Sequence, residues 1–343
     1  MKKKSLTLLF TLLLFSSVFA QKTFVPTPPS EGPGSFDYKH DQVLFHDYAE
    51  NPDGFWLFEP TSPKPDSAHV VVFNHGYGAY NPMIYGRWIK HIVKKGNIVI
   101  FPRYQKNLWT PRPNKFSKNV SQAIRDALKV LGNGNFVKPI TDKLALVGHS
   151  YGGVVAADLA VNFEHHEIPQ PQAVFLCSPG SGPLKGGLLK SYEGIPEDTQ
   201  LLIMVSENDH VVGQKFGKKV FKTAEKVRQR NLIWQYHDNT TSPPQYAGHN
   251  ECYSLDYEYD TGIRNGTTKR AIKKNRLNNV DYHGYWKLLD ALLDCSRNGD
   301  YCEFALGNTP EQRSLGKLAD GTPLKELKII VPTVPTQPSI SAQ

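Results

Sequence analysis

A serine between two glycines is the group in this sequence best suited to chemistry. Residues 148–152 read Gly-His-Ser-Tyr-Gly, and they separate an apolar stretch at 144–147 from a helix-like stretch at 154–161. A serine hydroxyl becomes a useful nucleophile only when a rigid turn presents it beside a base and beside backbone N–H donors for the developing oxyanion. Glycines two positions either side permit such a strand-to-helix turn. The pattern predicts that Ser150 is a nucleophile, with a glycine-flanked turn and a capping serine as the alternative.

The segments around this turn alternate between strand-like and helix-like patterns. Apolar stretches of strand length at 69–74 and 97–102 enclose an amphipathic stretch of helix length at 85–95. Such alternation, with nearly continuous apolar strands, indicates an α/β fold in which helices cover both faces of a mostly parallel central sheet. The loops at the carboxyl ends of the strands should then hold the site. Further strands are expected at 144–147, 173–177, 201–205 and 232–237, further helices at 117–131, 154–161, 213–227 and 285–293, and an opening hairpin at 41–45 and 54–60.

The order of these elements, together with the turn at 148–152, resembles the α/β-hydrolase superfamily over most of the chain from about residue 68 onward. Members are typically serine hydrolases in which an acid follows a later strand and a histidine follows the last one. The resemblance implies Asp209 as the acid, because it lies in the acidic loop after the strand at 201–205. Its role would be to orient the histidine and stabilise the imidazolium. Glu207 in the same loop is the weaker candidate.

Two histidines beyond the last predicted strand compete for the role of the base. His249 follows that strand by a short loop, whereas His283 begins the final helix after a basic insertion at 264–276. The stretch 281–292, followed by 305–310, resembles a terminal segment of a chlorophyllase-like or dienelactone-hydrolase-like branch of the superfamily, in which the position of His283 is usually aromatic. The resemblance therefore favours His249 as the base and a structural role for His283.

An oxyanion hole needs two backbone N–H donors, and the resemblance implies where they come from. One follows the nucleophile and is the amide of Tyr151. The other lies after an earlier strand, where the sequence His-Gly-Tyr at 75–77 implies the amide of Tyr77. Candidates for lining a substrate pocket, with ordinary core packing as the alternative, are the aromatic residues of the following loop and helix, Tyr80, Tyr85 and Trp88.

The first twenty residues read as a secretory signal peptide. Three lysines precede an apolar run at 6–15 that is too short to span a bilayer, and small residues at Val18 and Ala20 suggest cleavage before Gln21. We expect an exported protein, secreted or periplasmic, without stable membrane insertion after cleavage; an uncleaved anchor is the alternative. Removing the three lysines lowers the formal net charge from +8 to +5. The remaining cations lack the clustering of a nucleic-acid binder, so no nucleic acid is expected as a partner.

The mature chain is expected to form a single domain, because no proline-rich or serine-rich linker divides its middle. We place this α/β-hydrolase domain at 41–331, between low-complexity segments at 21–40 and 332–343 that are expected to be flexible. A basic run at 269–276 predicts a solvated helix face or a mobile loop. A weak electrostatic hold on an acidic polymer or surface is its alternative interpretation.

Four cysteines in an exported chain raise the question of disulfides. Cys295 and Cys302 are predicted to pair, because the Asn-Gly at 298–299 can turn the chain back between them. Cys177 and Cys252 remain either a second bridge or free thiols. The spacing lacks the close double pairs of a zinc site, so we predict no metal and no cofactor.

Together these features predict an exported serine hydrolase that cleaves a carboxylic ester, small or polymeric, through an acyl-enzyme. The same triad can cleave an amide or peptide bond, and a hydrolase fold can persist in a secreted binding protein without turnover; these are the alternatives. Only about twenty residues separate the strands at 173–177 and 201–205, which disfavours a lidded lipase. The acyl group, the alcohol group and the oligomeric state are left open.

Overall fold

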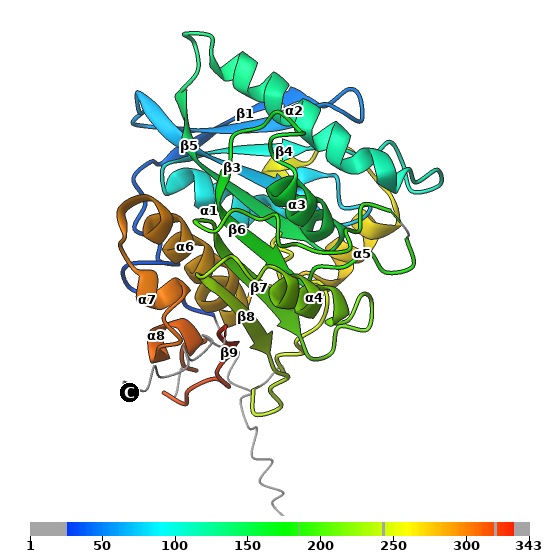
Figure 1. The fold of residues 1–343 in the computed structure, drawn as a ribbon. Coiled ribbons are helices and arrows are strands. Elements are labelled where there is room, and N and C mark those ends of the chain that lie inside the picture. Colours follow the sequence, from blue (N-terminus) through cyan, green and yellow to red (C-terminus); the bar gives the residue numbers. More distant parts are fainter. Residues whose placement is uncertain (1–25, 185, 242–243, 319–320, 333–343) are drawn as a thin grey trace, which may run out of the picture.

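The computed structural model describes residues 26–184, 186–241, 244–318 and 321–332. Its strands form one sheet in the order β1-β2-β4-β3-β5-β6-β7-β8-β9 (Figure 1). Neighbours from β4 through β8 run parallel, whereas β1, β2 and β9 pair antiparallel at the two edges. The strands are β1 (Gln42–Tyr48), β2 (Phe55–Thr61), β3 (Ser67–Asn74), β4 (Asn97–Pro102), β5 (Lys138–His149), β6 (Pro171–Cys177), β7 (Gln200–Ser206), β8 (Arg230–Gln235) and β9 (Lys328–Ile330).

Helices cover both faces of this sheet (Figure 1). Side chains alternate along a strand, so Val71 and Phe73 of β3 enter the core under α1 and α6, while Val70 and Val72 enter the core under α2, α3 and α4. The helices are α1 (Gly86–Lys94), α2 (Phe116–Leu131), α3 (Tyr151–Val161), α4 (Lys215–Thr223), α5 (Gly266–Lys274), α6 (Lys287–Asn298), α7 (Cys302–Ala305) and α8 (Pro310–Arg313), with short 3-10 turns η1 (Pro82–Tyr85), η2 (Pro113–Lys115) and η3 (Tyr257–Tyr259) and a π-helical turn η4 (Val280–Trp286).

This two-layered covering of a mostly parallel sheet is the α/β-hydrolase fold, and the predicted fold class is confirmed. The strands β4 and β7 are buried along their whole length, as continuous apolar runs in a parallel sheet should be. The helix α3 is buried on nearly all sides. Ser150, directly before α3, therefore stands on a rigid central element.

The predicted strands and helices are present, with shifts at their ends. The strand predicted at 144–147 is the end of a longer β5, and the helix predicted at 213–227 is shorter. The basic run at 269–276 lies mostly in the helix α5, as predicted for a helix face rather than a mobile loop. The strand β9 was not predicted, because three residues at a sheet edge are too few to show a pattern.

The N-terminal segment packs onto the domain. The Gly34 amide donates to Asp290 at 2.8 Å, and the Tyr38 hydroxyl bonds the buried His91 at 3.2 Å. In the described part of the chain the packed structure thus begins before residue 41, against the expectation that all of 21–40 is flexible. The predicted signal peptide at 1–20 lies outside the described residues, as does nearly all of the tail predicted at 332–343.

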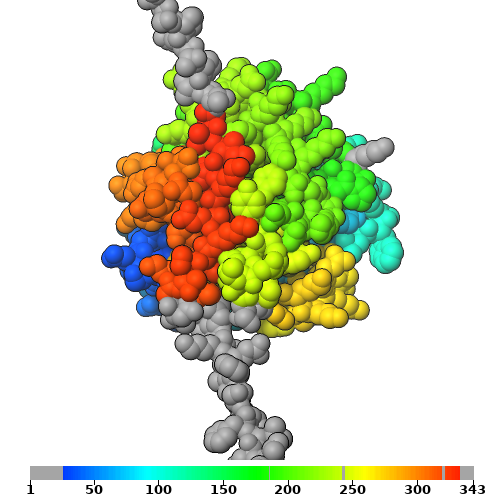
Figure 2. Space-filling model, turned by 90° about the horizontal axis from the view of Figure 1, so that it is seen from below, coloured from blue at the N-terminus to red at the C-terminus, as the bar shows by residue number. Residues whose placement is uncertain are grey.

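The C-terminal segment returns to the edge of the sheet. Figure 2 shows it, in red, between the orange region of α7 and α8 and the yellow-green region around β8. The Lys325 amide donates to the Asp238 carboxylate at 3.0 Å. The buried Lys287 ammonium donates to the carbonyls of Glu311 and Ser314, each at 2.6 Å. The loops around α8 are therefore fixed to α6.

The disulfide predicted between Cys295 and Cys302 is present. The helix α6 ends at Asn298, and Gly299 adopts φ 80°, a left-handed conformation that turns the chain back toward Cys302. Cys177 and Cys252 are buried free thiols, which resolves the alternative left open by the sequence. Across the described ranges no helix combines the length and apolar character needed to cross a bilayer.

Candidate active site

Ser150 stands on a tight turn between β5 and α3. Its backbone has φ 55° and ψ −121°, a conformation that side-chain-bearing residues rarely adopt and that must be held by its surroundings. The flanking glycines allow the turn to form: a Cβ at Gly148 would collide with the backbone of Gly152, and a Cβ at Gly152 would collide with the backbone of Asn74. The sequence thus places a serine hydroxyl at the carboxyl edge of the sheet on a backbone that cannot relax easily.

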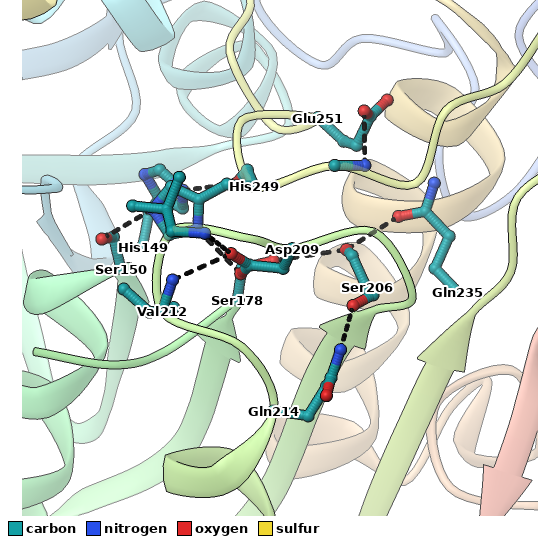
Figure 3. Close-up of polar contacts among 12 residues, drawn as sticks. His149, Ser150, Ser178, Ser206, Asp209, Val212, Gln214, Gln235, His249 and Glu251 are labelled. Carbon is teal, nitrogen blue, oxygen red and sulfur yellow. Dashed lines mark hydrogen bonds and ion pairs between the residues drawn. The ribbon is translucent and has the colours of Figure 1, made fainter. Parts of the chain in front are cut away.

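A hydrogen-bonded chain joins Ser150 to His249 and Asp209 (Figure 3). The Ser150 Oγ lies 2.8 Å from His249 Nε2, and His249 Nδ1 lies 2.8 Å from Asp209 Oδ2. Asp209 follows β7 and His249 lies in the loop after β8, so neighbouring strand ends bring the three side chains together. A carboxylate only accepts, so His249 Nδ1 carries its proton, and Nε2 is left to accept from the serine hydroxyl.

The Asp209 carboxylate is held in its ionised form. Burial by itself raises the pKa of Asp209, but the hydrogen bond and charge of His249 outweigh it, together with the amides of Val211 and Val212, which donate to Oδ1 at 2.9 and 3.0 Å. The pKa of Asp209 is therefore below its ordinary value. An ionised carboxylate in this position can fix the tautomer of His249 and stabilise its imidazolium form.

Two backbone amides are available beside the serine. Tyr151 is the first residue of α3, and Tyr77 lies in the loop after β3; both line the same cavity as Ser150. In the described part of the chain neither amide N–H has a hydrogen-bond acceptor, whereas the neighbouring amides of Gly76 and Gly78 are bonded. Unpaired N–H groups at a helix start are suited to an oxyanion.

The cavity at Ser150 has a volume of about 310 Å³ and a largely apolar wall. Among the described residues that line it there is no aspartate or glutamate, and the basic side chains are His149, His249 and Arg270 of α5. The wall is formed by the loops after β3, β4, β6, β7 and β8 and by α5. Its members include Tyr77, Leu108, Ser181, Pro183, Leu184, Val211, Val212, Tyr253 and Thr267.

The prediction that Tyr80, Tyr85 and Trp88 line a substrate pocket is wrong. Tyr85 and Trp88 are fully buried in the core beneath α1, Tyr80 is only 6 % exposed, and none of the three lines the cavity. Tyr85 at the end of η1 and Trp88 in α1 face the sheet and pack against Phe73 of β3, whereas the Tyr80 ring lies beside His75. The alternative interpretation, core packing, describes them correctly.

Tyr85 and His149 form a brace behind the site that the sequence did not suggest. His149 Nε2 lies 2.9 Å from the carbonyl oxygen of His249, so it must donate, and Nδ1 then accepts from the Tyr85 hydroxyl at 2.8 Å. The Tyr85 oxygen accepts from the Gly76 amide at 2.9 Å. Burial, with the charge of His249 as a smaller effect, lowers the pKa of His149 to about 3, which agrees with a neutral ring. The brace links the loops that carry Tyr77, Ser150 and His249.

The other sequence candidates lie apart from this group. His283 sits in the π-helical turn η4, where its Nε2 lies 2.9 Å from the Thr27 carbonyl oxygen. Glu207 points along the sheet edge and accepts from the His237 amide at 2.8 Å. Neither touches Ser150 or His249, so the structure brings together the favoured candidates and leaves out the rejected ones. No cluster of metal-ligating side chains is found among the described residues.

Comparison with known proteins gives one family. The model of the chlorophyllase family matches residues 33–187, a segment that includes the loop at 75–77 and the turn at 148–152 but ends before Asp209. No curated protein matches the chain. The similarity therefore covers Ser150 and the candidate oxyanion loop, while the candidate acid and base lie outside the matched segment.

Proposed function

We propose that this chain, which has the α/β-hydrolase fold and is similar to the chlorophyllase family over residues 33–187, is an exported serine esterase. Ser150 is the nucleophile, His249 the general base and acid, and Asp209 the residue that orients the base. The amides of Tyr77 and Tyr151 stabilise the oxyanion. The observation that carries the proposal is the unbroken hydrogen-bonded chain from Asp209 to Ser150 at the wall of a cavity.

The first half-reaction forms an acyl-enzyme. Ser150 Oγ attacks the ester carbonyl carbon, and its proton passes to His249 Nε2, which already lies 2.8 Å away. The carbonyl oxygen becomes an oxyanion and accepts from the two free amides. When the tetrahedral intermediate collapses, the C–O bond to the alcohol breaks and His249 gives the proton to the departing oxygen.

The second half-reaction regenerates the enzyme. A water enters on the side vacated by the alcohol and attacks the acyl carbon, while His249 takes one of its protons. Collapse of this second intermediate releases the carboxylic acid, and Ser150 Oγ recovers its proton from His249. Asp209 stays ionised throughout, which its lowered pKa supports.

Export is the second element of the proposal. The predicted signal peptide at 1–20 motivates it, and the disulfide between Cys295 and Cys302 is of the kind that persists in oxidising compartments. A secreted or periplasmic location is tested by fractionating cells that produce the full-length chain and by sequencing the mature N-terminus. The proposal predicts a protein that starts at Gln21; intact full-length protein in the cytoplasm would refute it.

The catalytic assignment is tested with Ser150→Ala. Wild-type protein should hydrolyse p-nitrophenyl butyrate, and the variant should lose activity by about 10⁵-fold or more while its circular dichroism stays unchanged. A panel of amides and peptides run beside the esters tests the amidase alternative. A tight ligand without turnover of any ester or amide would favour a binding protein; turnover by Ser150→Ala at the parent rate would remove the assignment.

A further inference from the structure

We propose that Arg270 binds a negatively charged group of the substrate, so that the preferred esters carry a carboxylate on their acyl or alcohol part. The inference rests on the proposed ester hydrolysis at Ser150 and specifies its substrate class. It follows from the position of α5 beside the cavity, from the charge of the cavity wall and from the lack of a partner for the guanidinium among the described residues.

The helix α5 is fixed to the loop that carries the candidate oxyanion donor. Asn265, the residue that caps α5, donates from its side-chain amide to the Gly78 carbonyl at 2.8 Å, and the Thr267 hydroxyl donates to the Tyr77 carbonyl at 3.4 Å. Gly78 has φ 78°, and a Cβ there would strike Thr267, so the helix and the loop are in close contact. The position of α5 is thereby tied to the oxyanion loop.

Helical periodicity then brings Arg270 to the cavity. Residues three apart share a helix face, and Thr267 and Arg270 both line the wall around Ser150. Lys269, Lys273 and Lys274 of the same helix do not line it. Of the four cationic residues of α5, Arg270 is the one that lines the cavity.

The electrostatics of the cavity favour an anion. The described residues of its wall include no aspartate or glutamate, and the Asp209 carboxylate is already hydrogen-bonded to His249. The charge of Arg270 acts on the buried Tyr253 of the same wall, where it opposes the larger effect of burial, which raises the pKa of that phenol. As far as the described residues of the wall are concerned, a carboxylate that enters the cavity therefore meets the Arg270 guanidinium and no competing carboxylate.

Arg270 has no protein partner in the described part of the chain. The nearby Arg264 is paired with Asp260 through both its terminal nitrogens, whereas no hydrogen bond or ion pair of Arg270 is found within the described ranges. An arginine offers a planar set of donors that fits a carboxylate with two parallel hydrogen bonds. A substrate carboxylate is the ligand that matches this unpaired group.

Two matched pairs of esters locate the charge. For the acyl part we compare the monoethyl ester of adipic acid with the ethyl ester of its monoamide, followed by titration of the released acid. For the alcohol part we compare 4-carboxyphenyl butyrate with 4-carbamoylphenyl butyrate, followed by absorbance of the phenol. Within each pair the two esters differ in charge but scarcely in shape.

The variants are Arg270→Gln, Arg270→Lys and the control Lys269→Gln, an exposed cation of α5 outside the cavity. In at least one pair, Arg270→Gln should lower kcat/KM for the charged ester, through KM, about tenfold more than it lowers kcat/KM for the neutral ester. Arg270→Lys should retain part of the preference for the charged ester over the neutral one, and Lys269→Gln should retain all of this preference. High salt should weaken the wild-type preference.

Each other outcome counts against the inference in a distinct way. Equal loss on charged and neutral esters would make Arg270 a structural residue of α5. An equal effect of Lys269→Gln would mean that the overall positive charge of α5, rather than a binding site at Arg270, produces the preference for the charged ester. No effect in either pair would overturn the inference while ester hydrolysis stands. If wild-type protein cleaves none of the four esters and no p-nitrophenyl ester, the proposed function fails instead.

Discussion

The described part of the chain contains two buried histidine–aspartate pairs with nearly equal distances between the ring nitrogen and the carboxylate. His249 Nδ1 lies 2.8 Å from Asp209 at the carboxyl edge of the sheet, and His91 Nε2 lies 2.9 Å from Asp290 between α1 and α6. The pairs differ in what the other ring nitrogen meets. In the first it is the hydroxyl of Ser150, and in the second it is the phenol of Tyr38 at 3.2 Å.

The surroundings give these pairs different uses. Ser150 lines a cavity, on a turn with free amides beside it, whereas Tyr38 belongs to the N-terminal segment that Asp290 also holds through the Gly34 amide. Burial, with the charge of Asp290 as a smaller effect, raises the pKa of the Tyr38 phenol, so this hydroxyl stays protonated. A histidine–aspartate pair is therefore a candidate for catalysis only when a nucleophile and a substrate cavity lie next to it. Without them, as at His91 and Asp290, the pair holds two segments of the chain together.

Removing the charge of the first pair should have the largest effect. Asp209→Asn keeps the shape of the side chain but favours the wrong tautomer of His249, and we expect kcat on p-nitrophenyl butyrate to fall about 10⁴-fold. Steady-state kinetics measure it. A fall of less than tenfold would mean that Asp209 does not orient the base.

The matched change in the second pair should act on stability. Asp290→Asn weakens charge-assisted hydrogen bonds to His91 and Gly34, and should lower the free energy of unfolding by about 2 kcal/mol. Activity per folded molecule should remain within twofold. Urea unfolding and ester kinetics on the same preparation check both. A large loss of kcat without loss of stability would erase the distinction between the pairs.

A brace distinguishes the first pair further. Tyr85→Phe removes the acceptor of the Gly76 amide and the donor to His149, so the loops of Tyr77 and His249 lose a common support. We expect kcat to fall about tenfold with KM nearly unchanged. His149→Gln, which can still donate to the His249 carbonyl, should retain more activity than His149→Leu. Equal kcat in the two His149 variants would contradict the brace.

The same brace predicts a pH dependence of stability. His149 has a folded-state pKa of about 3, below its ordinary value near 6.5, because burial disfavours its charged form. Its contribution to stability is full above the unfolded pKa and is lost as the pH falls toward the folded one. Over this interval His149→Gln should lower the slope of unfolding free energy against pH by up to about 1.4 kcal/mol per unit. Urea unfolding between these limits measures it; parallel slopes would contradict the prediction.

Local patterns predicted part of this arrangement. The nucleophile turn was recognisable because its strand, glycines and helix are consecutive in the chain, and Asp209 because it directly follows an apolar strand. The choice of His249 over His283 needed the order of strands, which a resemblance supplied. The geometry of the three side chains agrees with those choices.

The remainder depends on contacts between distant segments. The sequence placed Tyr85 and Trp88 near the site because they follow the oxyanion loop, but which side of α1 meets the sheet is decided by packing. The basic run gave no sign that Arg270 alone would reach the cavity, since Asn265 docks α5 onto a loop 187 residues away. The brace through His149 likewise joins residues 64 and 100 positions apart.

The most direct test of the central claim is labelling by a phosphonate ester that mimics the tetrahedral intermediate. Wild-type protein, His249→Gln and His283→Gln are treated in parallel, with circular dichroism as the check on folding, and the modified peptide is identified by mass spectrometry. We expect a single label on Ser150, formed at the wild-type rate in His283→Gln and at least about 10³-fold more slowly in His249→Gln. A label on another residue, or loss of labelling in His283→Gln with retention in His249→Gln, would contradict it.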